Sequence, residues 1–146
     1  MIKISPESLA KRALEDHKTI SELLEGVLSK NDQTRYGCFQ ALQLVGEERP
    51  ELLYPKWDFF AEMLRSDNAY HRNIALYIIA ALTEVDSQNK FGKLEDGYFA
   101  LLNSESLMNA GHAALNLGKI AEYKPELREK ITNMFLNIGN TYPIKD

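Results

Sequence analysis

Cysteine, glycine and proline are all scarce in this sequence of 146 residues. The single cysteine, Cys38, excludes a disulfide within the chain and fits a reducing compartment. Eight glycines and five prolines are too few for a turn-rich all-β fold or for long flexible linkers. No apolar run approaches the roughly 20 residues that a membrane-spanning helix needs, and the first residues lack the apolar stretch of a signal peptide. We therefore expect a cytoplasmic protein that does not contact a membrane.

Positive charge is also limited. The chain has 17 lysines and arginines against 21 aspartates and glutamates, and its net charge is −4. Nucleic-acid binding needs lysine and arginine to displace counterions from phosphate, so we expect no nucleic-acid partner. Hydrophobic residues make up 45% of the sequence, which is enough for one domain with a sizeable core. We expect a single domain over residues 1–146.

Apolar residues recur at helical spacing along the whole chain, and no segment alternates as a half-buried strand would. Ser5 is a good N-cap residue, and Pro6 follows it at the first helical position. Thr19 and Glu22 have the spacing of a capping box for a second helix that ends near Leu28. Further helices are predicted over residues 33–46, 54–65, 69–83, 93–102, 105–122 and 126–138. The sequence therefore predicts an all-α fold.

Three apolar segments repeat along the chain. Segments 41–45, 78–82 and 114–118 start 37 and then 36 residues apart. The first two follow the same pattern, Ser-x-Asn-x-x-x-Arg, which occurs at residues 29–35 and again at 66–72. A unit of two helices and about 37 residues is typical of an α-solenoid, in which each unit packs against its neighbours.

This spacing predicts how the chain is organised. A helical pair over residues 5–29 is followed by repeats over about 30–65, 66–102 and 103–139, and a short tail occupies 140–146. In the same frame, the first helix of each repeat should expose a corresponding stripe: Tyr36, Gln40 and Gln43; Asn73, Tyr77 and Ala80; Asn109, Ala113 and Asn116.

The two repeated turns resemble those of the HEAT-repeat family, which has an armadillo-type fold. In that family an arginine follows the turn early in the first helix, and Arg35 and Arg72 fall at that position. Ser29 and Ser66 stand where an acidic residue often pairs with the arginine. The third repeat has Met108 there, so a ladder of arginines should stop after two. The resemblance implies a right-handed α–α superhelix of about three repeats behind an N-terminal capping helix.

The resemblance covers about residues 18–139 and says little about function, because the family is defined by its packing and not by a site. No histidine or cysteine spacing typical of a metal site occurs, and no phosphate-binding loop is present. His17, His71 and His112 are expected to be structural or surface residues, and Cys38 is expected on a buried face. We therefore expect no catalytic residue, metal or cofactor.

The leading hypothesis is a non-catalytic scaffold that binds a protein or peptide. Solenoids present an extended surface along their second helices. The acidic residues on these predicted helices are candidates for binding a basic partner: Glu25, Asp58, Glu62, Asp96 and Glu129. Tyr54 and Trp57 are either buried between repeats or anchor the partner, because aromatic residues dominate interface energetics.

Two other functions are open. Some nucleic-acid glycosylases and bilin lyases have HEAT-like folds, so an enzyme is the first alternative; a structural subunit of a larger helical assembly is the second. The C-terminal end also looks uncovered, since the helices over 105–122 and 126–138 are apolar on most sides. A fold-back of the tail over 141–144, a second copy of the chain or another protein could cover Leu117, Ile120 and Leu136. We expect a second copy or another protein, because the tail is short.

Overall fold

The structure, a computed structural model, describes the backbone of residues 4–141 and the side chains of residues 4–137. Every regular element in that part of the chain is helical, which confirms the predicted all-α fold. The α-helices are α1 (Pro6–Glu15), α2 (His17–Gly26), α3 (Asp32–Glu48), α4 (Trp57–Leu64), α5 (Ala69–Leu82), α6 (Phe91–Ala100), α7 (Leu107–Tyr123) and α8 (Arg128–Thr141). Short 3₁₀ helices join several of them: η1 (Pro50–Leu52), η2 (Tyr54–Lys56), η3 (Thr83–Val85), η4 (Leu101–Asn103) and η5 (Pro125–Leu127). None of the described helices is long and apolar enough to cross a membrane.

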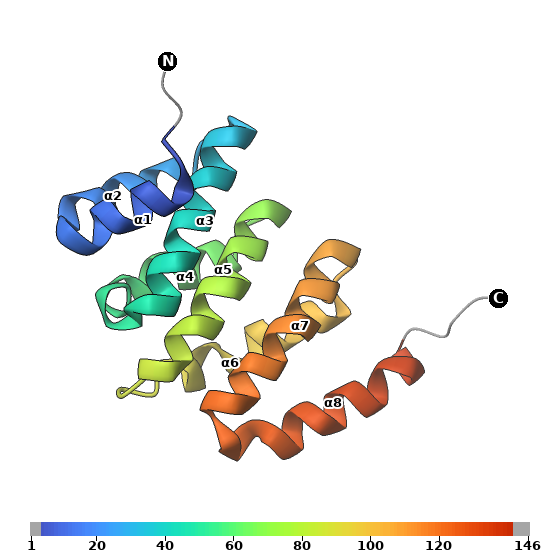
Figure 1. Ribbon diagram of the computed structural model, residues 1–146. Helices are drawn as coiled ribbons and strands as arrows, with labels where there is room; N and C mark the ends of the chain where they lie inside the picture. The colour runs from blue at the N-terminus through green and yellow to red at the C-terminus, as the bar shows by residue number, and fades with distance from the viewer. Residues whose placement is uncertain (1–3, 142–146) are drawn as a thin grey trace.

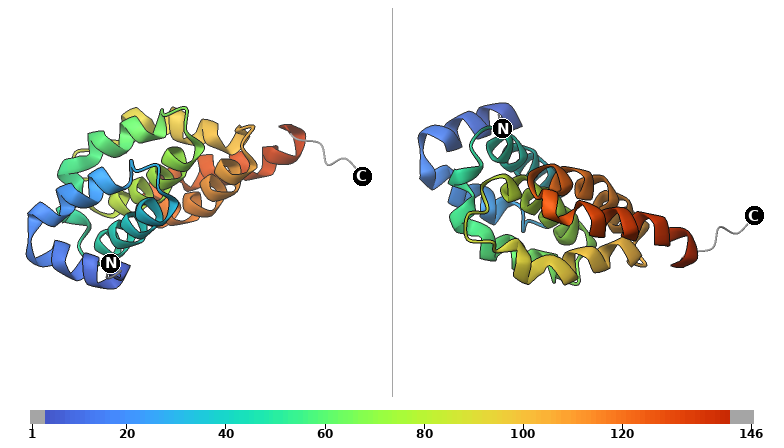
Figure 2. Two further views of the ribbon diagram at one scale, coloured as in Figure 1. Left: turned by 90° about the horizontal axis from the view of Figure 1, so that it is seen from above. Right: turned by 90° about the horizontal axis from the view of Figure 1, so that it is seen from below.

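The helices α3, α5 and α7 lie side by side, and α4 and α6 lie behind them (Figure 1). The views from above and below show α1 and α2 at one end of this row and α8 at the other (Figure 2). Helix α5 contacts α3, α4 and α7. A single apolar core runs through the whole row, from Ala10 in α1 to Ile131 in α8.

The two repeated turns fold in the same way. Asn31 and Asn68 are the N-caps of α3 and α5; the Asn31 side chain accepts one backbone N–H of its helix, and the Asn68 side chain accepts two. The hydroxyl of the serine two residues before each asparagine accepts the asparagine N–H at 3.1 Å. The carbonyl of that same serine accepts a hydrogen bond from the arginine, at 3.3 Å from Arg35 Nη1 and 2.8 Å from Arg72 Nη1. The repeated pattern is therefore a turn that caps its helix and is closed by an arginine.

The third turn shares the cap and the serine hydrogen bond of the other two, but it has no arginine to close it. Ser104 Oγ accepts the N–H of Ser106 at 3.1 Å, and Ser106 is the N-cap of α7. These serines follow their counterparts in the second turn by 38 residues, so the spacings are 37 and 38 and not 37 and 36. Ala110 therefore takes the position that Arg35 and Arg72 occupy in the first two turns. The prediction that Met108 occupies this position was wrong.

The corrected register also changes which face of α7 is exposed. Asn109, Ala113 and Asn116 were expected to be exposed, but they are 0%, 0% and 4% exposed. A shift of two residues turns a helix by roughly 200°, so these residues point inward. The residues in register with Asn73, Tyr77 and Ala80 are instead Gly111, Leu115 and Gly118, all exposed. Ala80, expected in the exposed stripe, is also fully buried.

The N-terminal helices differ from the prediction at one cap. Helix α1 begins as predicted, with Ser5 as N-cap and Pro6 in the first turn. Helix α2 begins earlier, because Asp16 Oδ1 accepts the N–H of Lys18 at 3.0 Å. Aspartate is as good an N-cap as any residue, so the helix starts there and the predicted cap, Thr19, is buried within it.

Helices α2 and α3 approach each other closely at Gly26. A Cβ atom at this position would lie 2.2 Å from Cys38 Sγ, so a side chain there would displace the thiol. Cys38, expected on a buried face, is half-buried and packs against the core. Burial raises the pKa of the Cys38 thiol.

Candidate functional site

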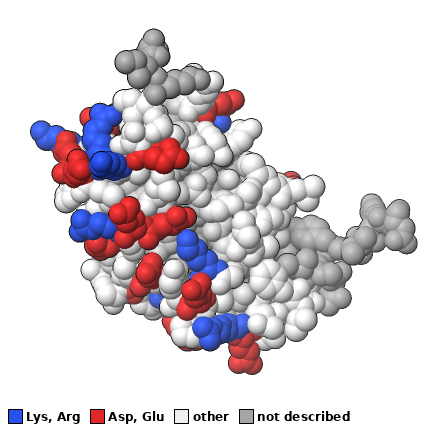
Figure 3. Space-filling view, in the orientation of Figure 1, with Lys and Arg blue, Asp and Glu red and all other residues white. Residues whose placement is uncertain are grey.

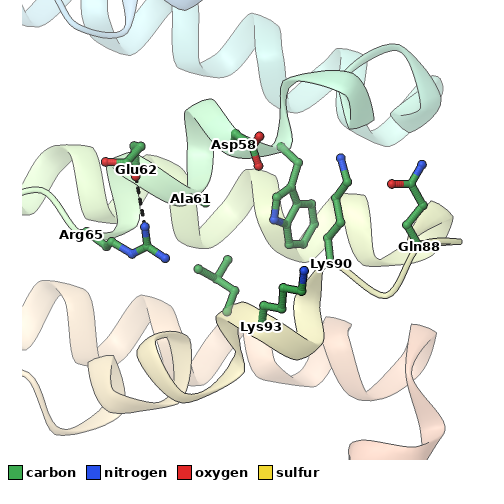
Figure 4. A pocket seen from close by; sticks show the side chains of 9 residues that line it. Asp58, Ala61, Glu62, Arg65, Gln88, Lys90 and Lys93 are labelled. Carbon is green, nitrogen blue, oxygen red and sulfur yellow. Dashed lines mark hydrogen bonds and ion pairs between the residues drawn. The ribbon is translucent and has the colours of Figure 1, made fainter.

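A groove of about 520 Å³ lies between α4 and α6. Figure 4 shows side chains from α4 along one wall and side chains from α6 and the loop before it along the other. The α4 wall holds three of the predicted residues, Trp57, Asp58 and Glu62. The groove therefore brings together residues from two consecutive second helices.

The groove carries both signs of charge, whereas the sequence predicted an acidic face. Glu62 Oε1 lies 3.1 Å from Arg65 Nη1, and both side chains are well exposed (Figure 4). Lys90 and Lys93 line the opposite wall. Asp58 makes no ion pair within the described part of the chain; it lies in the first turn of α4, where the helix dipole favours a carboxylate. Two carboxylates thus share this groove with three cations.

The other predicted acids lie on different helices. Glu25 is exposed on α2. Asp96 is fully exposed on α6, and its carboxylate is 3.9 Å from Lys130 Nζ of α8. Glu129, on α8, lines a shallow hollow together with Lys130. The structure therefore brings Asp58 and Glu62 into one groove but does not add the other three acids to it.

The two aromatic candidates belong largely to the core. Trp57 is only 3% exposed, so little more than its edge reaches the groove. Its ring meets the ring of Tyr54 edge-on, with centroids 6.0 Å apart. The Tyr54 hydroxyl donates a hydrogen bond to Asp86 Oδ1 at 2.6 Å, and Lys90 Nζ lies 4.8 Å from the centre of its ring. Of the two roles that the sequence left open, burial between helices describes Trp57.

A buried ion pair next to Tyr54 was not predicted. Asp86 Oδ2 lies 3.1 Å from Lys124 Nζ, and the two side chains are 0% and 9% exposed. The Asp86 carboxylate also accepts the N–H groups of Lys90 at 2.8 Å and Phe91 at 2.9 Å, which begin α6. One carboxylate therefore joins η2, the start of α6 and the end of α7.

The surroundings of Asp86 keep it ionised. Burial acts to raise the pKa of Asp86, but hydrogen bonds from Tyr54, from the two N–H groups and from Lys124 outweigh it, and the pKa falls below its ordinary value. Burial and the hydrogen bond to Asp86 raise the pKa of Tyr54. Because the Asp86 side chain is fully enclosed, a substrate cannot reach it. Its carboxylate instead holds η2, α6 and the end of α7 together.

The three histidines lie on three different helices, α2, α5 and α7. Burial, together with the nearby charge of Arg35, lowers the pKa of His71. His112 Nδ1 is 2.6 Å from the Tyr77 hydroxyl, which joins α5 to α7. His17 is exposed at the start of α2. Within residues 4–137, no three histidine, cysteine, aspartate or glutamate side chains come together as a metal site.

The resemblance to HEAT repeats depends on the turns before α3 and α5. Both close through the same hydrogen bonds, and Arg35 and Arg72 occupy the same place in them. Neither a protein-family model, nor a curated protein, nor a solved structure matches this chain.

Proposed function

We propose that this chain is a non-catalytic cytoplasmic scaffold that binds a protein or peptide, built as a right-handed α–α superhelix of HEAT-like repeats. The groove between α4 and α6 is the observation that carries the proposal, because it is open and is lined by two consecutive second helices. The matching turns support the repeat architecture. So do Leu42, Ile79 and Leu117, which stand in register and are all fully buried.

A basic segment of the partner fits the α4 wall of this groove. Asp58 has no cation within the described part of the chain, so its charge is available to the partner. Glu62 must first release Arg65, but exposed ion pairs contribute only about 0–1 kcal/mol, so the exchange costs little. Lys90 and Lys93 on the other wall repel a second basic segment and select where the first one lies. Charge complementarity of this kind mainly speeds association and sets specificity.

Reversing Asp58 and Glu62 together, by Asp58→Lys and Glu62→Lys, should weaken binding of a short oligolysine peptide at low salt. The expected loss is about 5- to 30-fold, corresponding to roughly 1–2 kcal/mol for two exposed charges. Trp57 is the only tryptophan and lines the groove, so its fluorescence can follow the titration. Added salt should weaken wild-type binding as well.

The matched control is the pair Glu47→Lys and Glu48→Lys, which makes the same change of charge at the exposed end of α3. This control should bind almost as the wild type does. If both double variants lose affinity equally, only the net charge matters; if neither does, the α4 wall is not the binding surface. Either result contradicts the proposal.

A second copy of the chain is the proposed partner for the C-terminal end. Of the three residues expected to be uncovered, Leu117 and Ile120 are fully buried by the chain itself, whereas Leu136 is 73% exposed. Two further leucines on α7 are exposed instead, Leu107 at 86% and Leu115 at 65%. Leu107 and Leu115 are about two helical turns apart on one face of α7, and apolar side chains grouped on one face mark a surface that another molecule can cover.

The exposed face of α7 matches another copy of itself better than it matches the N-terminal end. Leu107 and Leu115 lie on this face with Gly111 and Gly118, and the one exposed charge on α7 is Glu122 near its C-terminal end. The exposed side of α1 carries Ser8 and four charged residues, Glu7, Lys11, Arg12 and Glu15. Head-to-tail contact would cover these charges with leucine, which is costly. A two-fold contact between C-terminal ends avoids that cost.

The double substitution Leu107→Lys and Leu115→Lys should abolish self-association. Light scattering over a dilution series should show the mass of the wild type rising with concentration, while the double variant stays monomeric. Leu28→Lys is the control, because Leu28 is also exposed, at 48%, but follows α2 at the other end. A wild type that remains monomeric at high concentration would contradict this proposal.

A further inference from the structure

A second groove lies on the surface of the first helices, between the N-terminal halves of α3, α5 and α7. Its volume is about 350 Å³. Tyr36 and Phe39 come from α3, Tyr70 and Asn73 from α5, and Met108 from α7. None of the predicted site residues belongs to it, and it is separate from the groove between α4 and α6.

Two tyrosines border this groove and remain unusually exposed. Tyr36 is 61% exposed and Tyr70 is 55% exposed, although Phe39 between the same helices is buried. Tyrosine presents a large, rigid and partly apolar surface at a low cost in side-chain entropy, which makes it common in binding surfaces. The groove therefore offers two aromatic walls above an apolar floor.

The charges at the groove neutralise one another. Arg35 donates to Asp32 Oδ1 at 2.6 Å and to the carbonyl of Ser29 at 3.3 Å, and its guanidinium lies 4.5 Å from the centre of the Tyr70 ring. Figure 3 shows charged side chains over α1 and towards the C-terminal ends of α3, α5 and α7, whereas the surface over the N-terminal halves of α5 and α7 is largely uncharged. A ligand for this groove is therefore itself uncharged.

Asn73 supplies a polar group that is not satisfied. Its Oδ1 atom is buried and has no hydrogen-bond partner among the described residues. Buried acceptors are nearly always paired in folded proteins, so this atom marks a place where a donor is missing. Asn73 lines the groove, but its Oδ1 atom is enclosed, so a ligand reaches this atom only if the side chain rotates.

We propose that this groove binds an uncharged, extended peptide segment of a partner protein. One apolar side chain of the peptide lies between the rings of Tyr36 and Tyr70, above Phe39 and Met108. One backbone N–H donates to Asn73 Oδ1 after the Asn73 side chain turns towards the groove. The volume is at the small end of the range for ligand sites, so it holds one or two side chains and not a helix. A basic segment would be repelled by Arg35, and an acidic segment would be repelled by Asp32, because both residues line the groove.

The test uses a capped pentapeptide with a central leucine flanked by alanines, titrated into isotope-labelled protein and followed by NMR. Shifts are expected at Tyr36, Tyr70, the Asn73 side-chain amide and the Met108 methyl group. Methylating the backbone nitrogens of the peptide removes its donors and should weaken binding at least fivefold. Replacing leucine by lysine or glutamate should weaken it as much.

Variants separate this groove from the rest of the surface. Tyr36→Ala together with Tyr70→Ala should abolish the shifts while leaving the circular dichroism spectrum unchanged, since both side chains are more than half exposed. Gln40→Ala with Gln43→Ala, on the same helix face but outside the groove, should bind normally. Unchanged binding by the tyrosine variant, equal binding of the methylated peptide, or shifts confined to the α4–α6 groove would overturn the proposal. Failure of the oligolysine experiment would leave it standing.

Discussion

Replacing Ile78 by aspartate is expected to unfold the protein. Ile78 is 0% exposed in α5, and so are Leu76, Ile79 and Leu82 on the same helix. Helix α5 is buried on several sides because α3, α4 and α7 all contact it. A buried carboxylate without a partner costs several kcal/mol, and the lost burial of isoleucine adds about 1.5–3 kcal/mol. These amounts together are comparable to the roughly 5–15 kcal/mol by which a typical domain is stable.

Circular dichroism and thermal melting check this expectation. Ile78→Asp should lose most of its helical signal and its cooperative melt. Ile78→Val is the conservative control and should cost only about 0.5–1.5 kcal/mol. Tyr36→Asp adds the same charge at a position that is 61% exposed and should keep the fold. A cooperative melt of Ile78→Asp near the wild-type midpoint would show that α5 is not central to stability.

Removing the buried carboxylate by Asp86→Ala should destabilise the protein by about 3–5 kcal/mol, because it leaves Lys124 buried without a partner. It also removes the acceptor for the Tyr54 hydroxyl and for two N–H groups at the start of α6. Denaturant unfolding, monitored by circular dichroism, measures the loss. The double variant Asp86→Ala with Lys124→Met removes both charges, and it should recover part of the loss. If the double variant is as unstable as the sum of the two single variants, the two charges are not coupled.

The pH dependence of Asp86 has a definite sign. Its folded pKa lies below its ordinary value near 3.9, so its contribution to stability is fully present above that value. The contribution is lost as the pH falls through the folded pKa. The difference in unfolding free energy between wild type and Asp86→Ala should therefore be constant from about pH 5 to 7 and shrink below about pH 4. A difference that grows in acid would contradict this assignment.

Much of the fold could be predicted because helix starts are set by local chemistry. Ser5, Asn31 and Asn68 each cap their helix through a side chain within the same turn. The third repeat was placed wrongly because its frame was taken from apolar residues. The position of a helix depends on its capping residue. Ser106, the N-cap of α7, places the third repeat two residues later than the apolar residues indicated. This difference decides whether Asn109 and Asn116 face solvent or the core.

The site was predictable only in part, for a different reason. Asp58 and Glu62 stand out as exposed acids on one helix, but Lys90 and Lys93 reach the same groove from a neighbouring helix pair. The most important partners lie about one repeat apart: Asp86 and Lys124, and likewise Arg72 and Asn109, whose Oδ1 accepts from Arg72 Nε at 2.8 Å. A sequence pattern shows the repeat length, but it does not show which polar side chains meet across it.

The contrast between the two ends of the molecule would limit how far the proposed self-association can extend. The outer side of α1 is charged, and the exposed face of α7 carries leucine and glycine at four positions. Pairing through α7 would consume both apolar faces and leave two charged ends pointing outward. A contact that is the same on both partners closes after two copies, whereas a head-to-tail contact can continue into a fibre. The uneven ends thus favour a dimer of fixed size over an open-ended polymer.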